Sequence, residues 1–536
     1  MDTRLKFQNL HFFSKLVKAY LNQNELIFSL YNLFPTLENF PKVIEFKSKQ
    51  AIDRDNLVQV LNTQYASITD AGLTLQNIEK LRLDNTFTIT TGHQLNLFSG
   101  PLYFIYKIVS TIKLTHQLQL QYPNFNFVPV YWMATEDHDW DEINHFNITD
   151  SHQIKWNNDV DFAVGTVHTD GLRNIMEELK PIWNSDDFGS ELLNMFEAAY
   201  LKGYSLSDAT RVLVHQLFSQ YGLVILDAQD RLLKKSFIPI MKQELDQQVV
   251  FKDVIQTNQF LKENAFETQV NPREINLFYL TQNARQRILK EADLFKVNHT
   301  DIVFTTQEME IELESHPERF SPNVLMRPLY QESILPNLAY IGGGGEINYW
   351  LQLKGVFDTF QIPFPMLVLR NSALWVTEKQ IRKWEKLGLS TTDMLSHSQE
   401  IANLIINQNE PQNKPDFQEL ENDLKQLINP IENWAVQVDP TLIPGIKGTL
   451  QKQLNEWAHW EQKLQRSLKK KNSDALERAE IIRAELYPND SLQERFLNFS
   501  VFYKDMGSAF IRQLWNEFDP LAFEFKILKL PNSQKF

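Results

Sequence analysis

Short apolar runs and amphipathic helical stretches alternate between residues 87 and 370. The runs that we predict as strands are Phe87–Thr91, Phe125–Met133, Gly222–Leu226, Ala339–Ile341 and Phe364–Leu369. The stretches that we predict as helices cover about residues 102–120, 205–220 and 346–360. This alternation is typical of α/β proteins, in which helices cover both faces of a mostly parallel sheet. Ligands of such sheets bind beyond the carboxyl ends of the strands, so we expect the chemistry in the loops that follow these runs.

After about residue 375 the apolar residues recur at alternating intervals of three and four. One stripe contains Phe417, Leu420, Leu424, Leu427, Ile431, Trp434 and Val438. A second stripe follows a Pro/Gly turn at residues 439–445 and contains Leu450, Leu454, Trp457, Leu464 and Leu468. The spacing predicts an antiparallel coiled-coil arm of two helices, although ordinary core packing in a helical domain would also give such stripes.

Aromatic residues return after Ser491, which indicates that the C-terminal segment packs back on the α/β core. We therefore predict three parts. Residues 1–375 form the core with an N-terminal helical segment, residues 376–490 form the inserted arm, and residues 491–536 form the returning segment.

Composition and charge restrict the functional classes. The 536 residues suggest roughly two to four domains, and 43% hydrophobic residues supply a large core. A net charge of −14 does not favour binding of nucleic acid or of an anionic membrane. The absence of cysteine excludes disulfides, thiolate metal ligands and a cysteine nucleophile. No signal peptide and no run of about 18 apolar residues is recognisable, so we expect a cytoplasmic protein.

A glycine-containing loop joins the first predicted strand to the helix near residue 102. Its candidate binding residues are Thr91, Gly92, His93, Gln94 and Gly100, with Lys107 on the following helix. Backbone N–H groups at such a turn approach a ligand closely, and the helix N-terminus favours a phosphate or carboxylate. We expect His93 to neutralise a developing phosphoryl charge. The alternative is a glycine turn with a structural histidine.

An acidic loop follows the second predicted strand. Its candidate catalytic residues are Glu136, Asp137, His138 and Asp139. Crowded ionisable groups at a strand end perturb one another's pKa values and supply acids, bases or metal ligands. A solvated acidic loop, or a helix N-cap, is the alternative.

A third group surrounds the fourth predicted strand. It contains Arg327, Tyr330 and Gln331 before the strand, then Gly342, Gly343, Gly345 and Glu346 after it, and Arg370 after the last strand. Consecutive glycines form a backbone nest for an anion or nucleotide, and arginine binds carboxylate or phosphate in a bidentate manner. The alternative is a flexible turn with a structural arginine.

Four motifs resemble those of one known family. They are T-G-H-Q-x-x-L-F-x-G-P-L-Y-x-x-Y-K at 91–107, V-P-V-x-W-x-A-x-E-D-H-D-x-x-E-x-N-H at 128–145, P-E-R-F-S-P-N-V-x-x-R-P-L-Y-Q-x-x-x-L-P at 317–336 and A-Y-x-G-G-x-G-E-x-x-Y-W-L-Q-L at 339–353. Together they resemble the bacillithiol synthase family, the BshC cysteine ligases of bacillithiol biosynthesis. The first motif adds Tyr103 to the candidate binding residues. His93 is a departure, because the family commonly has glutamine there.

The resemblance implies a Rossmann-like, nucleotidyltransferase-like core, a coiled-coil domain and a homodimer through the arm. It also implies that L-cysteine is added to glucosaminyl-malate as an amide. Because amide formation from a free carboxylate needs activation, we expect an ATP-dependent ligase that uses ATP with Mg²⁺ and holds no tightly bound metal. The His-x-Gly-His pair and the Lys-rich loop of ATP-using relatives are absent here. Two alternatives are a metal-dependent hydrolase or amidase built on residues 136–139, and a non-catalytic coiled-coil scaffold.

Overall fold

The computed structural model describes residues 3–184, 186–411 and 413–530. It divides into two compact units. The larger unit contains Arg4–Trp375 and the chain from Pro488 onward, and the smaller contains chiefly Val376–Tyr487. No helix of the described residues is long and apolar enough to cross a membrane.

A five-stranded sheet forms the centre of the larger unit. Its strands are β2 (Thr86–His93), β3 (Asn126–Met133), β6 (Val224–Asp227), β12 (Asn337–Gly342) and β13 (Met366–Leu369). All neighbours pair in parallel, in the order β13-β12-β2-β3-β6. Every predicted run forms one of these strands, so the predicted parallel α/β sheet is confirmed. The strand order reverses between β2 and β12, which makes this boundary the topological switch point at which such folds bind ligands.

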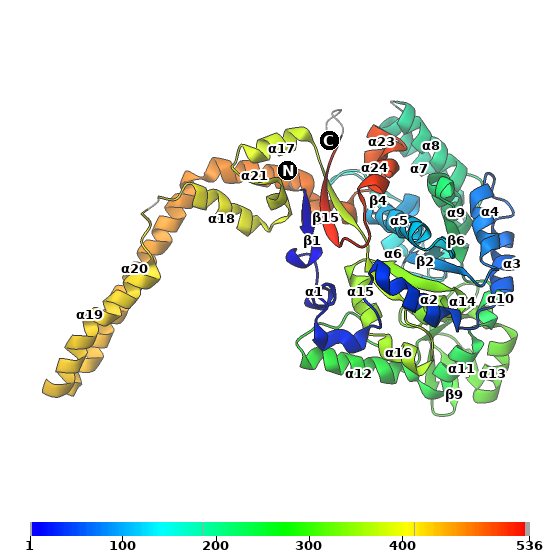
Figure 1. Ribbon diagram of the computed structural model, residues 1–536, viewed down its shortest axis with the longest axis horizontal. Coiled ribbons are helices and arrows are strands. Elements are labelled where there is room, and N and C mark those ends of the chain that lie inside the picture. The colour runs from blue at the N-terminus through cyan, green and yellow to red at the C-terminus, as the bar shows by residue number, and fades with distance from the viewer. Residues whose placement is uncertain (1–2, 185, 412, 531–536) are drawn as a thin grey trace. The chain divides into compact units, whose positions relative to one another are not determined.

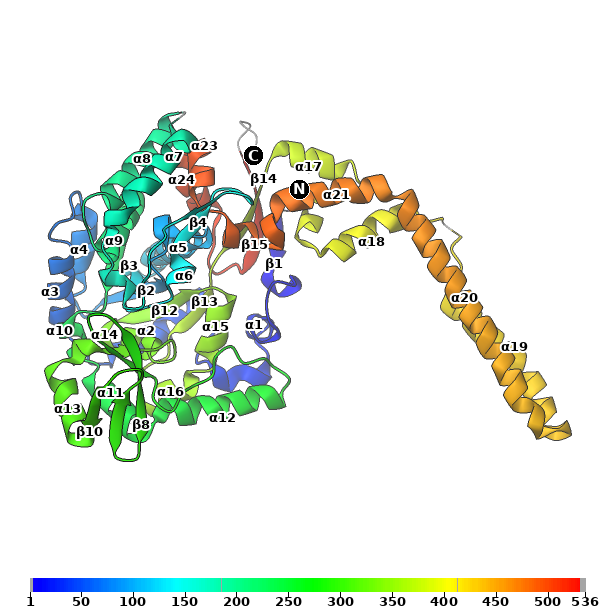
Figure 2. The same cartoon turned by 180° about the vertical axis from the view of Figure 1, so that it is seen from behind.

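Helices cover both faces of this sheet, and its strands are buried on both faces (Figures 1 and 2). On one face, α2 (Phe40–Ser48) and α5 (Tyr103–Gln121) pack against β2 and β12 in one apolar cluster. On the other face, Tyr330 of α14 (Arg327–Ile334) packs edge-on against Trp132 of β3, with ring centroids 5.3 Å apart. The helix α15 (Gly344–Leu351) begins directly after β12.

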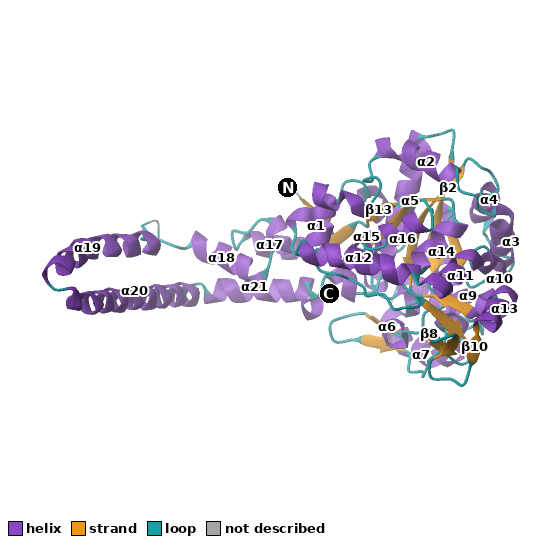
Figure 3. Ribbon diagram, turned by 90° about the horizontal axis from the view of Figure 1, so that it is seen from below, coloured by secondary structure: helices purple, strands orange, loops and turns teal. Residues whose placement is uncertain are grey.

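A second, antiparallel sheet lies in the same unit and was not predicted from the sequence. Its strands are β7 (Leu277–Leu280), β8 (Arg285–Glu291), β9 (Leu294–Val297), β10 (Val303–Thr305) and β11 (Phe320–Pro322), in the order β10-β9-β8-β7-β11. Figure 3 draws its strands in orange. Most of these strands have only three or four residues, and the longest, β8, is rich in charged residues, so the sequence pattern did not reveal them.

The remaining elements of the larger unit surround these sheets. Its other helices include α1 (Lys15–Leu21), α3 (Arg54–Gln64), α4 (Gly72–Lys80), α6 (Trp140–Ile143), α7 (Arg173–Trp183), α8 (Asp187–Tyr200), α9 (Leu206–Phe218), α10 (Arg231–Lys235), α11 (Ile238–Gln247), α12 (Val249–Glu263), α13 (Thr306–Ser315) and α16 (Lys354–Thr359). After Pro488 come α22 (Gln493–Phe496), α23 (Ser500–Met506), α24 (Ala509–Glu517) and β15 (Glu524–Lys529). The strand β15 joins β1 (Arg4–Lys6) and β14 (Ser372–Val376) in one sheet, and β4 (His145–Asn147) pairs with β5 (Gln153–Lys155).

The smaller unit is helical. It contains α17 (Glu378–Glu385), α18 (Ser398–Gln408), α19 (Phe417–Val438), α20 (Ile443–Lys471) and α21 (Ser473–Leu486). Figure 2 shows α19 and α20 side by side, joined by the short turn at Pro440–Leu442. The first part of the predicted stripe on α19 is partly covered, at Phe417, Leu420 and Leu424, but its other members Leu427, Ile431, Trp434 and Val438 are exposed. Beyond Leu424 the covered face of α19 runs through Ile428 and Ala435 instead.

Candidate active site

A cavity of about 630 Å³ lies at the carboxyl ends of β2, β3 and β12, with β7 and β8 on another side. Twelve of the candidate residues line it: Gly92, His93, Gln94, Tyr103, Lys107, Glu136, Asp137, His138, Asp139, Arg327, Tyr330 and Glu346. The sheet topology therefore brings residues from all four motifs to one space. The other candidates, Thr91, Gly100, Gln331, Gly342, Gly343, Gly345 and Arg370, are not part of its lining.

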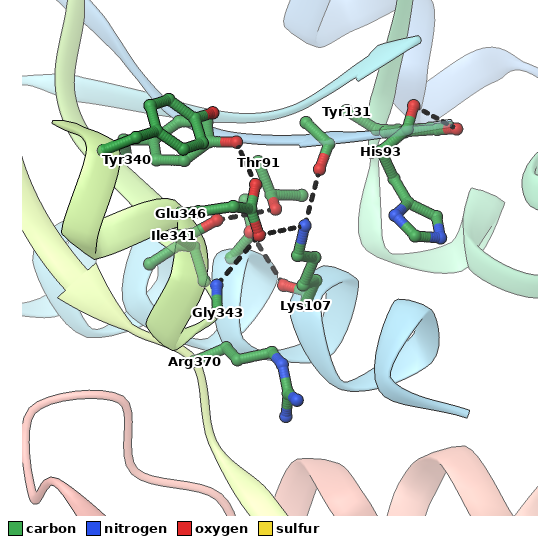
Figure 4. A network of polar contacts seen from close by, with 12 residues as sticks. Thr91, His93, Lys107, Tyr131, Tyr340, Ile341, Gly343, Glu346 and Arg370 are labelled. Carbon is green, nitrogen blue, oxygen red and sulfur yellow. Dashed lines mark hydrogen bonds and ion pairs between the residues drawn. The ribbon is translucent and has the colours of Figure 1, made fainter. Parts of the chain in front are cut away.

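Lys107 and Glu346 form an ion pair at the switch point, shown in Figure 4. Lys107 Nζ lies 2.5 Å from Glu346 Oε2 and donates a 2.8 Å hydrogen bond to the carbonyl of Gly92. Tyr340 donates from its hydroxyl to the other carboxylate oxygen, at 2.5 Å. Burial alone would raise the pKa of Glu346, but the Lys107 ammonium and the Gly343 N–H lower it below its ordinary value. This pair ties β2, α5 and α15 together at the cavity wall.

The glycine run after β12 binds the side-chain carboxylate of Glu346. The N–H of Gly343 donates a 2.9 Å hydrogen bond to Glu346 Oε2, in the geometry of a helix capping box. Gly342 is the last residue of β12, and Gly345 is exposed on α15. The sequence predicts that this run forms a nest for a substrate anion. The expectation is corrected for Gly343, because an internal anion already accepts its N–H.

Arg327 brings a charge without a carboxylate partner to the cavity. Its guanidinium donates to Gln331 Oε1 at 3.0 Å and to the hydroxyl of Tyr349 at 3.3 Å, both neutral acceptors. No carboxylate of the described residues lies within ion-pair distance of it. A guanidinium is always ionised and presents five N–H donors, so it offers unused donors to an anion. Gly92 lies close by, and a Cβ there would be 3.4 Å from the guanidinium.

Asp137 is the ionised carboxylate of the acidic loop. It accepts hydrogen bonds from the His138 N–H at 2.8 Å and from Gln94 Nε2 at 2.9 Å. Burial would raise the pKa of Asp137, but these hydrogen bonds and the charge of Arg285 lower it to about 2. In contrast, burial and the charge of Asp137 raise the pKa of Asp139. The two neighbouring carboxyl groups are therefore suited to different tasks.

His138 is held by an arginine that the sequence motifs did not include. Arg285 of β8 approaches His138 Nδ1 with NH1 at 2.9 Å, and it also donates to Ser321 and to the carbonyl of Pro322. Because a guanidinium can only donate, His138 Nδ1 must accept, and the ring proton lies on Nε2. Ligand atoms of Asp137, His138 and Asp139 lie within 4.8 Å of one another. A divalent cation bound there would have to sit beside the Arg285 charge, so the set suits a metal poorly.

Glu136 is occupied by internal partners. Its Oε1 pairs with the buried Lys234 at 2.6 Å, and its Oε2 accepts from Ser321 Oγ at 2.9 Å. Lys234 donates also to the carbonyl of Phe320, at 2.7 Å. These contacts join the acidic loop to β11 and α10. Glu136 therefore anchors the loop. Asp137 and Asp139 are the better candidates for contact with a substrate.

His93 does not carry the charge that we had expected. Burial, with the charges of Lys107 and Arg370, lowers the pKa of His93 well below its ordinary value. Its ring stacks on Phe104, with centroids 4.9 Å apart, and its Nε2 has no hydrogen-bond partner among the described residues. A neutral imidazole has one N–H donor and one acceptor nitrogen but no charge. The neutral form can donate one hydrogen bond to a phosphate, but it does not neutralise the phosphoryl charge.

Arg370, Thr91 and Gly100 lie outside the cavity lining, and their contacts are within the protein. Arg370 pairs with the buried Glu494 at 2.7 Å, and Thr91 donates to the carbonyl of Ile341 at 2.8 Å. Gly100 adopts φ +61°, and a Cβ there would lie 2.5 Å from Cβ of Asn96. Arg370 is thus neutralised internally and does not supply an anion site in the cavity.

Comparisons with known proteins agree with this architecture. Two family models match in succession: "Bacillithiol biosynthesis BshC, N-terminal Rossmann-like domain" over residues 1–371 and "Bacillithiol biosynthesis BshC, C-terminal coiled-coil domain" over residues 373–530. The chain belongs to the BshC family. The predicted Rossmann-like domain and coiled-coil domain are thereby confirmed.

Several BshC relatives match along almost the whole chain, each named "Putative cysteine ligase BshC". The relative from Flavobacterium johnsoniae is 46% identical and covers 98% of this chain and 99% of its own. That from Christiangramia forsetii is 43% identical, with 98% of each chain covered. That from Bacillus mycoides is 27% identical, with 94% of this chain and 95% of its own covered.

The antiparallel sheet adds cavity residues that the BshC motifs did not predict. Arg285 and Arg287 of β8 line the same cavity as Arg327, as does Arg273, which precedes β7. Arg285 and Arg287 stand two residues apart in β8, in the stretch Arg-Gln-Arg-Ile-Leu-Lys-Glu. Alternate residues of a strand share one face, so this spacing was a usable sign of a basic strand face. Nothing in the sequence showed that the face meets the acidic loop.

Proposed function

We propose that this chain is an ATP-dependent ligase that joins the carboxyl group of L-cysteine to the amine of glucosaminyl-malate. The observation that carries the proposal is one cavity that contains both an unpaired guanidinium, Arg327, and an ionised carboxylate, Asp137. Such a site suits substrates with an anionic group and an ammonium group. The names of the BshC relatives support the same reaction class.

The chemistry requires activation because a carboxylate and an amine do not condense to an amide in water. ATP supplies it: a cysteine carboxylate oxygen bonds to a phosphorus of ATP while pyrophosphate or ADP leaves. The sugar amine then attacks the carbonyl carbon, AMP or phosphate leaves, and one proton is lost from nitrogen. Electrostatic stabilisation of the phosphoryl charge is the main task of a protein in such a transfer.

The cavity residues divide these tasks by charge. Arg327 is the anion-binding residue for the ATP phosphates, with ATP entering as its Mg²⁺ complex, because its donors face two neutral acceptors only. Asp137, ionised at neutral pH, binds the cysteine ammonium. Asp139, whose pKa is raised, is the better proton acceptor for the sugar amine, since efficient bases have a pKa nearer the working pH.

Substitution of Arg327 tests the proposal. The purified protein is incubated with cysteine, glucosaminyl-malate and ATP, and the amide and the released phosphate or pyrophosphate are measured by mass spectrometry. We expect Arg327→Lys to lower kcat/KM for ATP by about 100-fold, because lysine cannot bind a phosphate with two N–H groups. Arg82→Lys, at an exposed surface ion pair, is the matched control. Amide formation without ATP, or full activity of Arg327→Lys, would refute the proposal.

A further inference from the structure

We propose that Lys47 and Glu332, a buried ion pair outside the cavity, position Arg327 for anion binding through the side chain of Gln331. The inference deepens the proposed function and rests on Arg327 as its anion-binding residue. It gives the helix α2, which contains Lys47, a part in the site. The sequence shows no chemical motif in this helix.

The first contact joins Arg327 to Gln331. Arg327 NH1 donates a 3.0 Å hydrogen bond to Gln331 Oε1. A glutamine amide presents an oxygen on one side and an NH₂ group on the other, and rotation by 180° exchanges them. In the exchanged orientation, N–H donors of both side chains would face each other. The hydrogen bond between Arg327 and Gln331 therefore forms only if the oxygen of Gln331 points toward the guanidinium.

Glu332 determines which way the amide of Gln331 points. Gln331 Nε2 donates a 2.9 Å hydrogen bond to Glu332 Oε1. Both side chains are buried, and an ionised carboxylate can only accept hydrogen bonds. The same oxygen accepts from Asn337 Nδ2 at 2.7 Å. Exchanging the amide would set the Gln331 oxygen against this carboxylate, so Glu332 fixes the orientation that Arg327 needs.

Lys47 pairs with the second carboxylate oxygen of Glu332. Its Nζ lies 3.0 Å from Glu332 Oε2, and both side chains are almost fully buried, at 1% and 0% exposure. Lys47 Nζ also donates to the backbone carbonyl of Glu332, at 2.9 Å. The ion pair thus fixes the carboxylate of Glu332, and this carboxylate orients the amide of Gln331. The oriented amide in turn accepts the hydrogen bond that holds the guanidinium of Arg327.

Two double variants separate this role from a structural one. Lys47→Met with Glu332→Gln removes both charges but keeps an oxygen that can accept from Gln331. Lys47→Met with Glu332→Met removes the charges and the acceptor, and apolar replacement of a buried ion pair is often compatible with folding. We expect the first to retain kcat/KM for ATP within about twofold of the wild type. We expect the second to lose about tenfold, with KM for cysteine changed less than twofold.

Two controls show the route of the effect. In a Gln331→Met background the two double variants should have equal kcat/KM for ATP, because the intermediary is absent. Asn337→Ser removes the other donor to Glu332 Oε1 and should leave kcat/KM for ATP unchanged. Equal activity of the two double variants with Gln331 present would overturn the proposal, since an ion pair that only supports the fold gives that result.

A crystallographic readout makes the inference independent of the reaction. In the Glu332→Gln double variant, the guanidinium of Arg327 should stay within hydrogen-bond distance of residue 331. In the Glu332→Met double variant it should move away. If the wild type shows no ATP-dependent ligation, the proposed function fails while this comparison still decides the positioning role. An unmoved Arg327 in the Glu332→Met double variant would refute it.

Discussion

Arg285 and His138 stand 147 positions apart in the chain, and 2.9 Å separates NH1 of the arginine from Nδ1 of the histidine. The contact joins the antiparallel sheet to the acidic loop at the end of β3. The guanidinium also lies 3.9 Å from the ring centre of Phe278. Arg285 of the antiparallel sheet therefore holds the acidic loop. It fixes the ring of His138 and places a positive charge near Asp137.

We expect Asp137→Asn and His138→Ala each to lower ligation by at least about 100-fold while the protein stays folded. Asparagine keeps the size of Asp137 but removes its charge and sets an NH₂ group against Gln94. Alanine at 138 removes the acceptor of Arg285. Activity is measured with cysteine, glucosaminyl-malate and ATP, and folding by the melting temperature.

Glu419→Gln on the exposed face of α19 is the matched control for these loop variants, and it should change activity little. If Asp137 only supported the loop, its substitution would cost about 1 kcal/mol of stability and leave turnover intact. Near wild-type turnover of both loop variants would exclude this loop as the active site.

Asp137 also predicts a pH dependence of stability. The native pKa of about 2 lies below the ordinary value of 3.8, so the folded state binds fewer protons than the unfolded state. The stabilisation is therefore complete above about pH 4 and is lost as the pH falls from 3.8 toward 2. The shift corresponds to roughly 2 kcal/mol at most.

Denaturant unfolding of the wild type and of Asp137→Asn at pH 6, 4 and 3 measures this contribution. The difference in unfolding free energy between the two proteins should shrink between pH 4 and pH 3. A difference that stays constant across these pH values would show that the Asp137 charge is not stabilised in the folded protein.

The parallel sheet could be predicted because its strands are short runs of apolar and β-branched residues that alternate with helical stretches. The acidic loop could be found because it directly follows such a run, and Arg327 because it lies in one of the family motifs. Other parts of the site depend on pairings that no local pattern shows. The capture of the Gly343 N–H by Glu346 and the contact of Arg285 with His138 both arise only when separate segments meet. Burial of His93 beside Lys107 likewise removes a charge that the residue type alone suggests.

We predict a homodimer from the exposed apolar residues of the arm. Leu427 and Trp434 of α19 are 71% and 69% exposed, and Ile431 and Val438 lie on the same stripe and are also exposed. An exposed apolar stripe of this length on a helical hairpin is suited to pairing with a second copy. We expect Leu427→Glu with Trp434→Glu to yield a monomer by light scattering, without loss of helical content. A dimer that persists in this variant would show that the stripe is not the interface.

Two glycines of the candidate motifs should respond to alanine in opposite ways. Gly100→Ala places a side chain at φ +61° and a Cβ 2.5 Å from Asn96 Cβ, so we expect a loss of about 2 kcal/mol or more. Gly345 lies in α15 with only the side chain of Gln269 near, at 3.9 Å. There alanine should raise stability by about 0.5–1 kcal/mol, because it reduces the entropy lost when the helix forms.

Urea unfolding measures both stability changes, and steady-state kinetics decides the role of Gly345. Because Gly345 is outside the cavity lining, Gly345→Ala should leave kcat and KM for ATP unchanged. The backbone N–H that a nucleotide would need at this turn is retained in the variant, and only a Cβ is added. A rise in KM for ATP would therefore mean that a ligand approaches the start of α15 closely. That result would restore the glycine run as part of the binding site.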